Sequence, residues 1–316
     1  MESLQIVFLD IETVGALPEL AQLHSLGDYK AYPQSSPEEV ADRIRHAHIV
    51  LTNKVKITEA HLQACQYLRL ICVTATGMNN VDLTAANARG ISVKNVAGYA
   101  VETVAQHTFA VLLHLHHHLP YYDNYVKSGA YSGSPHFTHL DRPYCELAGK
   151  RMGIIGLGNI GRAVARVAGD GFGMKVVYHS TTGRNDNAAY QRLPLEELLA
   201  TSDIVSIHAG LTAQTKSLIG RTQLAQMKDS ALLINMGRGG IVVEDDLAKA
   251  LDAGIIRGAC MDVFEQEPLP ADHPFLQLQH PERIVLSPHI AWAAIEARQR
   301  LMQGVIQHIE DYKNSL

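Results

Sequence analysis

The sequence predicts an α/β protein built from two parallel-sheet units. Short segments rich in β-branched residues, typical of buried strands, alternate with segments typical of helices along most of the chain. An irregular stretch, residues 127–147, interrupts this alternation, which restarts at Lys150. The length of 316 residues, of which 47% are hydrophobic, is enough for two domains with a core each.

The first unit is expected to contain four strands with helices between them. Strands are predicted at 4–10, 48–53, 68–77 and 91–96. A helix is predicted over 36–47, because Ser36 precedes Pro37 there and acids occupy the first turn.

A longer apolar helix is predicted from about Val101 to about Leu119, where Pro120 should stop it. It ends in the run "HLHHHL", in which His114 and His118 would share a helix face, a spacing that can bind a metal ion. Because no third ligand is indicated, packing or a subunit interface is the favoured role of this run. The irregular stretch that follows is interpreted as an extended excursion over the surface.

The second unit should form another parallel sheet. Its strands are predicted at 151–155, 175–179, 203–209, 231–236, 258–264 and 283–289. One amphipathic helix, 293–314, is expected to end the chain.

Charge and composition argue against several kinds of partner. The net charge is −5 with histidines neutral and no block of like charge stands out, which disfavours nucleic acid and membrane surfaces. No apolar run approaches the roughly 18 residues of a spanning helix, and the acidic start does not resemble a signal peptide. The four cysteines are expected to be reduced, buried thiols, with a catalytic cysteine as the alternative. We expect a small-molecule partner and a cytoplasmic location.

A glycine-rich turn carries the clearest motif. Gly156-x-Gly158-x-x-Gly161 follows the strand "RMGII" and opens a helix, which is the context of a dinucleotide-binding turn. The first glycine would make the tight turn, the second would let backbone approach a pyrophosphate, and the third would allow close helix–strand packing. The phosphates would lie at the positive end of the helix, beside Asn159 and Ile160.

Three later strands end in residues suited to chemistry. Arg238 lies in "INMGRGG", Asp262 and Glu267 lie in "MDVFEQEP", and His289 lies in "LSPHIAW". Open α/β sheets bind ligands at the carboxyl ends of their strands, so these side chains are expected to share one edge. Each alone could be a surface cation, a loop carboxylate or a packed imidazole. Because all of them follow strands beside a nucleotide-binding turn, we expect that they form a catalytic site.

These motifs make the chain resemble the D-isomer-specific 2-hydroxyacid dehydrogenases over nearly its whole length. The resemblance is carried by "ATGMNNVD", "ELAGKRMGIIGLGNIG", "SIHAGLTAQTKSLIG", "LLINMGRGGIVVEDDLAKAL", "GACMDVFEQEP" and "SPHIAW". The segments "LTNKVKIT" and "HIAWAAIEARQRL" are most similar to the glycerate dehydrogenase, or hydroxypyruvate reductase, branch.

The resemblance implies a fold that the order of elements alone does not give. A Rossmann nucleotide domain, residues 100–288, would be inserted in a flavodoxin-like substrate domain made of residues 1–99 and 289–316. Two hinges would flank a cleft. A homodimer built around the long helix that begins near Val101 is also implied.

The resemblance further assigns roles to single residues. Arg238 would bind the 2-keto acid through its carboxylate and carbonyl oxygens, for which a planar fork is well suited. His289 would donate the proton during reduction, and Glu267 would favour its imidazolium form. Substrate contacts are also implied at Thr76, Gly77 and Tyr99. Cofactor contacts are implied at His208, Thr212, Met236 and Asp262, the last holding the nicotinamide carboxamide.

Two positions depart from the usual pattern. Gly210 replaces a proline, which should loosen the loop near the cofactor. His179 stands where an Asp would bind the ribose and repel a 2′-phosphate. Ser180 and Thr181 supply hydrogen-bond donors and Arg184 supplies a cation. A site for NADP(H) is therefore favoured over a relaxed site that accepts NAD(H) or both cofactors.

The sequence therefore predicts an oxidoreductase that transfers a hydride between a nicotinamide cofactor and a small 2-keto or 2-hydroxy acid. Hydroxypyruvate/D-glycerate and glyoxylate/glycolate are the favoured pairs. Glu267, where formate dehydrogenases have Gln, argues against that group. The alternatives are a relative for bulkier 2-keto acids and a nucleotide-sensing corepressor, which would usually carry extra terminal segments.

Overall fold

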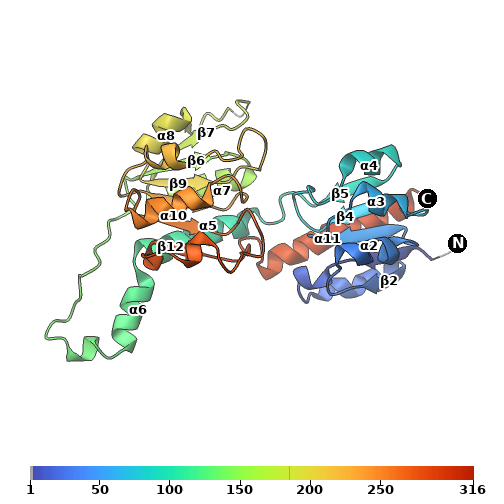
Figure 1. Ribbon diagram of the computed structural model, residues 1–316, viewed down its shortest axis with the longest axis horizontal. Helices are drawn as coiled ribbons and strands as arrows, with labels where there is room; N and C mark the ends of the chain where they lie inside the picture. Colours follow the sequence, from blue (N-terminus) through green and yellow to red (C-terminus); the bar gives the residue numbers. More distant parts are fainter. Residues whose placement is uncertain (1–2, 185) are drawn as a thin grey trace. The chain divides into compact units, whose positions relative to one another are not determined.

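The computed structural model describes residues 3–184 and 186–316, and each of its two compact units is a layered α/β structure (Figure 1). The units are Met1–Ala100 with Ala293–Leu316 (unit 1) and Val101–Trp292 (unit 2). The loop that carries His289 therefore belongs to unit 2. The limits expected for the functional domains, 99/100 and 288/289, stay a prediction.

Unit 1 is built on a five-stranded, wholly parallel sheet. The strands lie in the order β2-β1-β3-β4-β5, which is the flavodoxin-like order and confirms the predicted fold class. Their bounds are β1 Gln5–Phe8, β2 Asp28–Ala31, β3 Ile49–Thr52, β4 Leu70–Val73 and β5 Ser92–Asn95. The four predicted strands are present, and β2 is an additional edge strand whose side chains are partly exposed.

Helices cover both faces of this sheet. Their bounds are α1 Leu23–Leu26, α2 Pro37–Ile44, α3 Glu59–Gln63, α4 Leu83–Ala88 and α11 Ile295–Asn314. Helix α2 begins as predicted, since Ser36 N donates to Glu39 Oε2 at 2.8 Å in a capping box. Helix α11 buries Met302, Val305 and Ile309 completely, because residues three and four apart face the sheet.

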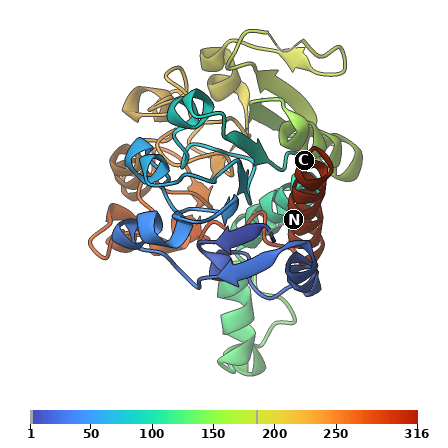
Figure 2. The same ribbon diagram turned by 90° about the vertical axis from the view of Figure 1, so that its right-hand side faces the viewer.

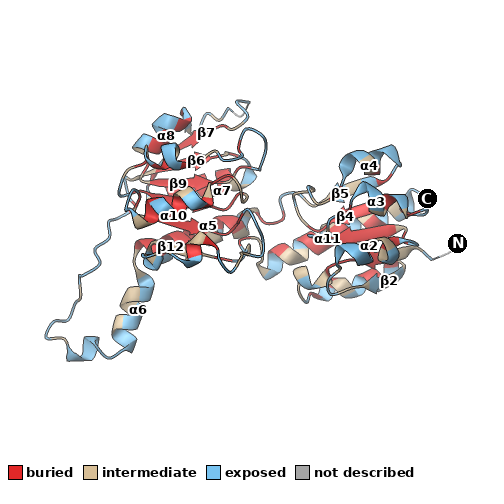
Figure 3. Cartoon of the chain, viewed as in Figure 1, coloured by how far each residue is buried: buried red, intermediate tan, exposed pale blue. Residues whose placement is uncertain are grey.

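Unit 2 is built on a seven-stranded parallel sheet. The strand order is β12-β11-β10-β9-β6-β7-β8, in which the first strand of the unit, β6, lies between β7 and β9 as in a Rossmann fold. The bounds are β6 Arg151–Ile155, β7 Lys175–His179, β8 Gln191–Arg192, β9 Ile204–Ile207, β10 Leu232–Asn235, β11 Gly258–Met261 and β12 Ile284–Leu286. The predicted strands are present, and the sheets form the buried layers of both units (Figure 3).

The helices of unit 2 include one that the sequence did not predict. Their bounds are α5 Val101–His116, α6 Leu119–Lys127, α7 Asn159–Arg166, α8 Leu195–Thr201, α9 Arg221–Leu224 and α10 Glu244–Asp252. The expected helix from Val101 to Leu119 is wrong at its end: α5 stops at His116, and His118 has a left-handed φ of 52°. Pro120 lies in the first turn of α6 instead of ending α5, because no amide donor is needed there.

This break separates the two histidines that a single helix would have aligned. His114 belongs to α5, whereas His118 lies outside it in the left-handed conformation. Among residues 3–184 and 186–316, no group of three His, Cys, Asp or Glu side chains could hold a metal ion. The histidine-rich run thus forms a helix–helix joint.

The stretch after α6 is exposed, as predicted, but it forms an arm that leaves the unit instead of running over its surface. Helix α6 buries none of its residues, and it extends away from the sheet of unit 2 together with the chain that follows it (Figures 1 and 2). Phe137 is 91% exposed and Leu140 is 75% exposed. None of the helices formed by residues 3–184 and 186–316 combines the length and the hydropathy of a membrane-spanning segment.

Candidate active site

The glycine turn has the geometry that a dinucleotide requires. Gly156 has a φ of +92°, and a Cβ there would lie 2.9 Å from Ala209 N. A Cβ on Gly161 would lie 2.3 Å from Gly156 O, so any side chain would push α7 off the turn. A Cβ on Gly158, in contrast, would meet no atom within 4 Å. The space in front of the α7 N-terminus therefore fits a pyrophosphate.

The three predicted reactive side chains occupy one edge of the unit 2 sheet. Arg238 follows β10, Glu267 follows β11 and His289 follows β12. These strands are consecutive neighbours and all parallel, so their carboxyl ends meet.

A buried asparagine shapes the loop that presents Arg238. Asn235 is completely buried; its Oδ1 accepts from Gly237 N at 3.0 Å and its Nδ2 donates to Arg238 O at 3.1 Å. Arg238 Nη1 donates to Gly237 O at 2.8 Å. A Cβ on Gly239 would overlap Phe264 O, so this loop packs directly on the backbone that leads to Glu267. The sequence alone does not single out Asn235, whose only signal is its place at a strand end.

His289 and Glu267 form a close pair. His289 Nδ1 lies 2.7 Å from Glu267 Oε2, and the two side chains are 22% and 29% exposed. Glu267 Oε1 accepts from Phe264 N at 3.1 Å, which fixes the carboxylate. His289 has a left-handed φ of 55°, a conformation that costs a non-glycine residue roughly 1–2 kcal/mol. Such strain is typical of functional sites held by their surroundings.

Asp262 helps to hold the loop of His289 in this conformation. Its carboxylate is 1% exposed and accepts from Ser287 Oγ at 2.6 Å and from the backbone N–H groups of Ile290 and Ala291 at 2.9 Å each. His107 Nε2 lies 3.0 Å from Ser287 Oγ on the same network. The structure thus gives Asp262 a role in fixing the His289 loop, and its predicted contact with the nicotinamide stays a prediction.

Ser180, Thr181 and Thr182 form a hydroxyl cluster directly after β7. This cluster lies beside the glycine turn, because Gly156 N donates to His179 O at 3.0 Å. His179 Nδ1 lies 3.2 Å from Leu193 O. Ser180 is buried, Thr181 is partly buried and Arg184 is exposed.

A second arginine, which the sequence alone does not single out, lies across the same turn. Arg192 Nη1 donates to Gly183 O at 3.1 Å and lies 3.4 Å from Asp186 Oδ1. Its side chain is 41% exposed. Arg192 comes close to this turn because β8 pairs with β7, with Arg192 opposite Tyr178.

The loop after β9 carries the next predicted cofactor residues. His208 Nε2 lies 2.8 Å from Ser206 Oγ, its Nδ1 is buried without a partner, and burial lowers the pKa of His208 to about 3. Thr212 is exposed, and its backbone N donates to Thr215 Oγ1 at 2.8 Å. Met236 is buried at the end of β10.

The residues implied in substrate binding belong to unit 1. Thr76 Oγ1 donates to Val96 O at 3.3 Å, Gly77 follows on the same loop, and the Tyr99 side chain is buried. Asp10 holds the neighbouring 53–55 loop through the backbone N–H groups of Asn53, Lys54 and Val55. Burial raises the pKa of the Asp10 carboxyl.

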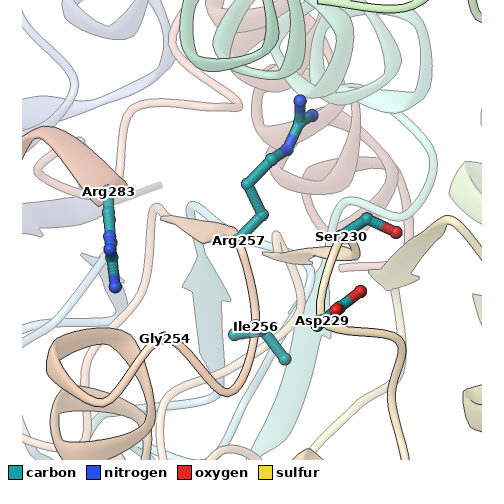
Figure 4. Close-up of a pocket in the computed structure, with 6 residues that line it drawn as sticks. All are labelled: Asp229, Ser230, Gly254, Ile256, Arg257 and Arg283. Atoms are coloured by element: carbon teal, nitrogen blue, oxygen red, sulfur yellow. The ribbon is translucent and has the colours of Figure 1, made fainter.

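A hollow of about 410 Å³ lies at the other edge of the unit 2 sheet (Figure 4). It is lined by Asp229, Ser230, Gly254, Ile256, Arg257 and Arg283. These residues precede or flank the starts of β10, β11 and β12. The Arg257 side chain points away from Asp229 (Figure 4) and contacts His116. None of the predicted site residues lines this hollow, so we place the chemistry at the carboxyl edge.

Comparisons with known proteins show the family and the fold. A family model described as "D-isomer specific 2-hydroxyacid dehydrogenase, NAD binding domain" matches residues 109–291. The hydroxypyruvate reductase of Blautia hydrogenotrophica is 36% identical over 297 residues, covering 92% of this chain and 90% of the relative. The glycerate dehydrogenase of Methylorubrum extorquens is 37% identical over 309 residues, covering 98% and 96%. A solved acyclic imino acid reductase in complex with NADPH and D-Arg has a TM-score of 0.87 at 27% identity, covering 99% and 98%.

Proposed function

Because this chain belongs to the D-isomer-specific 2-hydroxyacid dehydrogenase family and is an NAD(P)-dependent oxidoreductase, we propose that it reduces hydroxypyruvate or glyoxylate. The observation that carries the proposal is the His289–Glu267 pair at 2.7 Å on the sheet edge that also presents Arg238. The names of the two relatives favour hydroxypyruvate and its product D-glycerate as the natural pair.

Arg238 would bind and orient the 2-keto acid. Its guanidinium is a fixed positive fork, suited to a carboxylate oxygen and the neighbouring carbonyl oxygen together. Asn235 and Gly239 hold the backbone of this loop, and the guanidinium N–H groups that do not bond to Gly237 O would bind the substrate. Thr76 and Gly77 would add backbone donors for the carboxylate.

His289 would hold the proton that the carbonyl oxygen receives. Glu267 Oε2 accepts the hydrogen bond from His289 Nδ1, so Nε2 is the nitrogen left to face a substrate oxygen. The Glu267 carboxylate would also stabilise the imidazolium form of His289. When bound, the nicotinamide cofactor would supply the hydride. The Asp262 contacts to Ile290 and Ala291 keep the imidazole in place.

We also propose that NADP(H) is the preferred cofactor. His179 brings no negative charge to the ribose, so a 2′-phosphate meets no repulsion there. Ser180 and Thr181 offer hydroxyls, Arg184 follows them in the chain, and the Arg192 guanidinium donates to Gly183 O on the same turn. The NADPH in the imino acid reductase structure supports this choice for a chain of the same fold.

A homodimer and a cytoplasmic location complete the proposal. The exposed arm presents apolar side chains of a size rarely left to solvent, among them Phe137 and Leu140. A second copy of the chain would cover them, and replacing both by serine should shift the sedimentation of the protein toward the monomer. Four free cysteines, of which Cys145 is exposed, favour a reducing compartment.

Steady-state kinetics test the function directly. Reduction of glyoxylate, hydroxypyruvate, pyruvate and a bulky 2-keto acid should be measured with NADH and NADPH separately. The highest kcat/KM is expected for hydroxypyruvate or glyoxylate, and His289→Ala should lower kcat roughly 100- to 10,000-fold without weakening cofactor binding comparably. Cofactor binding without turnover of any of the four acids would instead favour a nucleotide-sensing role.

A further inference from the structure

A second histidine–glutamate pair lies buried behind the active site. His273 Nε2 lies 2.8 Å from Glu244 Oε2, and the side chains are only 9% and 10% exposed. The other oxygen of Glu244, Oε1, accepts from Glu265 N at 2.8 Å. Glu244 is the first residue of α10, so its carboxylate connects that helix to the loop after β11.

The hydrogen bonds of His273 define its tautomer. Phe275 N donates to His273 Nδ1 at 3.2 Å, so Nδ1 carries the lone pair. The proton must therefore be on Nε2, where it points at Glu244. The result is a neutral imidazole that donates to a carboxylate, with every polar atom of the pair satisfied inside the protein.

The pair holds the loop that carries Glu267. Glu265, whose N–H is fixed by Glu244, adjoins Phe264, whose N–H donates to Glu267 Oε1. His273 fixes the far end of the same loop and packs against the Phe275 ring at 4.8 Å. The backbone of Phe264 and Glu265 also supports Gly239, next to Arg238.

We propose that Glu244 and His273 are positioning residues of the reaction, which lock the 264–275 loop so that Glu267 stays within hydrogen-bond distance of His289 Nδ1. The inference rests on the proposed role of Glu267 as the partner of His289. A shift of about 1 Å in such a group typically costs on the order of 100-fold in rate.

Glu244→Gln is the sharpest single test, because it changes hydrogen-bond polarity and little else. Two donors face this side chain, Glu265 N–H and His273 Nε2–H, and an amide can accept from only one of them while its NH₂ opposes the other. We expect kcat for keto-acid reduction to fall about 10- to 100-fold, with the Kd of the cofactor unchanged.

A matched control and a double mutant separate positioning from general stability. His280 and Glu282 form the same residue pair at the surface, 3.4 Å apart and 43% and 55% exposed, so Glu282→Gln should leave kcat unchanged. In a Glu267→Gln background, Glu244→Gln should lower kcat little further, because its effect acts through Glu267. Full additivity of the two losses would overturn the proposal.

The outcomes distinguish this inference from the proposed function. If Glu267→Gln alone has no effect, the proton relay itself is wrong. If Glu267→Gln lowers kcat and a folded Glu244→Gln does not, only the positioning role is wrong. Should Glu244→Gln fail to fold, His273→Gln, which can still donate to Glu244, must retain more kcat than His273→Leu; equal losses contradict the proposal.

Discussion

Nδ1 of His289 lies 2.7 Å from Oε2 of Glu267, and the second oxygen of that carboxylate is held by Phe264 N–H. The carboxylate therefore faces the imidazole with one oxygen and cannot rotate away without losing its hydrogen bond from the Phe264 backbone N–H. This arrangement stabilises the protonated ring, which is the form that a keto-acid reduction consumes.

Glu267→Gln should move the pH profile of reduction toward lower pH. Reduction consumes the proton that His289 donates, so the rate falls as protons become scarce at high pH. Without the carboxylate the imidazolium loses its stabilising partner, and the fall should begin at lower pH. The measurement is kcat/KM for hydroxypyruvate against pH, with the exposed neighbour Glu265→Gln as control. An unchanged profile would show that Glu267 does not act on His289.

Arg238→Lys should not be a mild change. Lysine keeps the charge but loses the planar fork, so one of two charge-assisted bonds disappears and the keto acid is misaligned. We expect a loss of about 2–4 kcal/mol in transition-state stabilisation, measured from kcat/KM. Arg221→Lys, on α9, is the control. Near-normal kinetics in a folded Arg238→Lys enzyme would contradict the assignment.

His208 should make the protein sensitive to acid. Burial lowers its pKa from 6.5 to about 3, so the unfolded chain binds a proton below pH 6.5 that the folded chain does not. The contribution of His208 to stability is therefore complete only well above pH 6.5 and declines as pH falls toward 3, by roughly 1.7 kcal/mol between pH 6.5 and 5.

His208→Gln should reduce this decline, which thermal unfolding of the cofactor-free protein between pH 7 and 5 would measure. His280→Gln, at an exposed position, should leave the decline as it is in the wild type. The same acid sensitivity in the His208→Gln protein would show that other groups cause it.

Much of the fold could be predicted because it depends on local patterns. Buried parallel strands are short apolar runs, and the turn that joins β6 to α7 needs glycine at Gly156 and Gly161 for steric reasons that any such turn shares. Helix α6 could not be predicted, because Pro120 is compatible with a helix start and with a helix stop. The left-handed φ of His118 separates α5 from α6, and no local sequence pattern predicts this conformation.

Site residues could be predicted where the reaction requires a particular side chain. They could not be predicted where a residue only holds the reacting groups in place through hydrogen bonds. Arg238, Glu267 and His289 stand in recognisable motifs after strands. Asn235 and Glu244 act through hydrogen bonds to backbone groups. Such contacts leave no pattern in the sequence, since any buried polar residue could make them and only the tertiary structure selects the partner.

The two arginines beside the hydroxyl cluster should share the discrimination between cofactors. Arg184→Ala and Arg192→Ala should each weaken NADPH much more than NADH, because NADH has no 2′-phosphate to lose. One charge-assisted contact at a partly exposed site is worth roughly 1–3 kcal/mol, a selective loss of about 5- to 150-fold in kcat/KM. Arg166→Ala, on the exposed face of α7, is the control. Equal losses for both cofactors would mean that these arginines support the turn and do not bind phosphate.

His179→Asp should act in the opposite sense. An aspartate at the end of β7 would restore the acceptor for the ribose hydroxyls and the repulsion of a 2′-phosphate, so NADH use should rise while NADPH use is suppressed. The wild type is expected to prefer NADPH, and the ratio of kcat/KM for the two cofactors measures both effects. His179→Asn, which lacks the charge, should suppress NADPH less than His179→Asp. A wild-type preference for NADH of about tenfold or more would show that loss of the aspartate, even with Arg184 and Arg192 beside the turn, does not create an NADP site here.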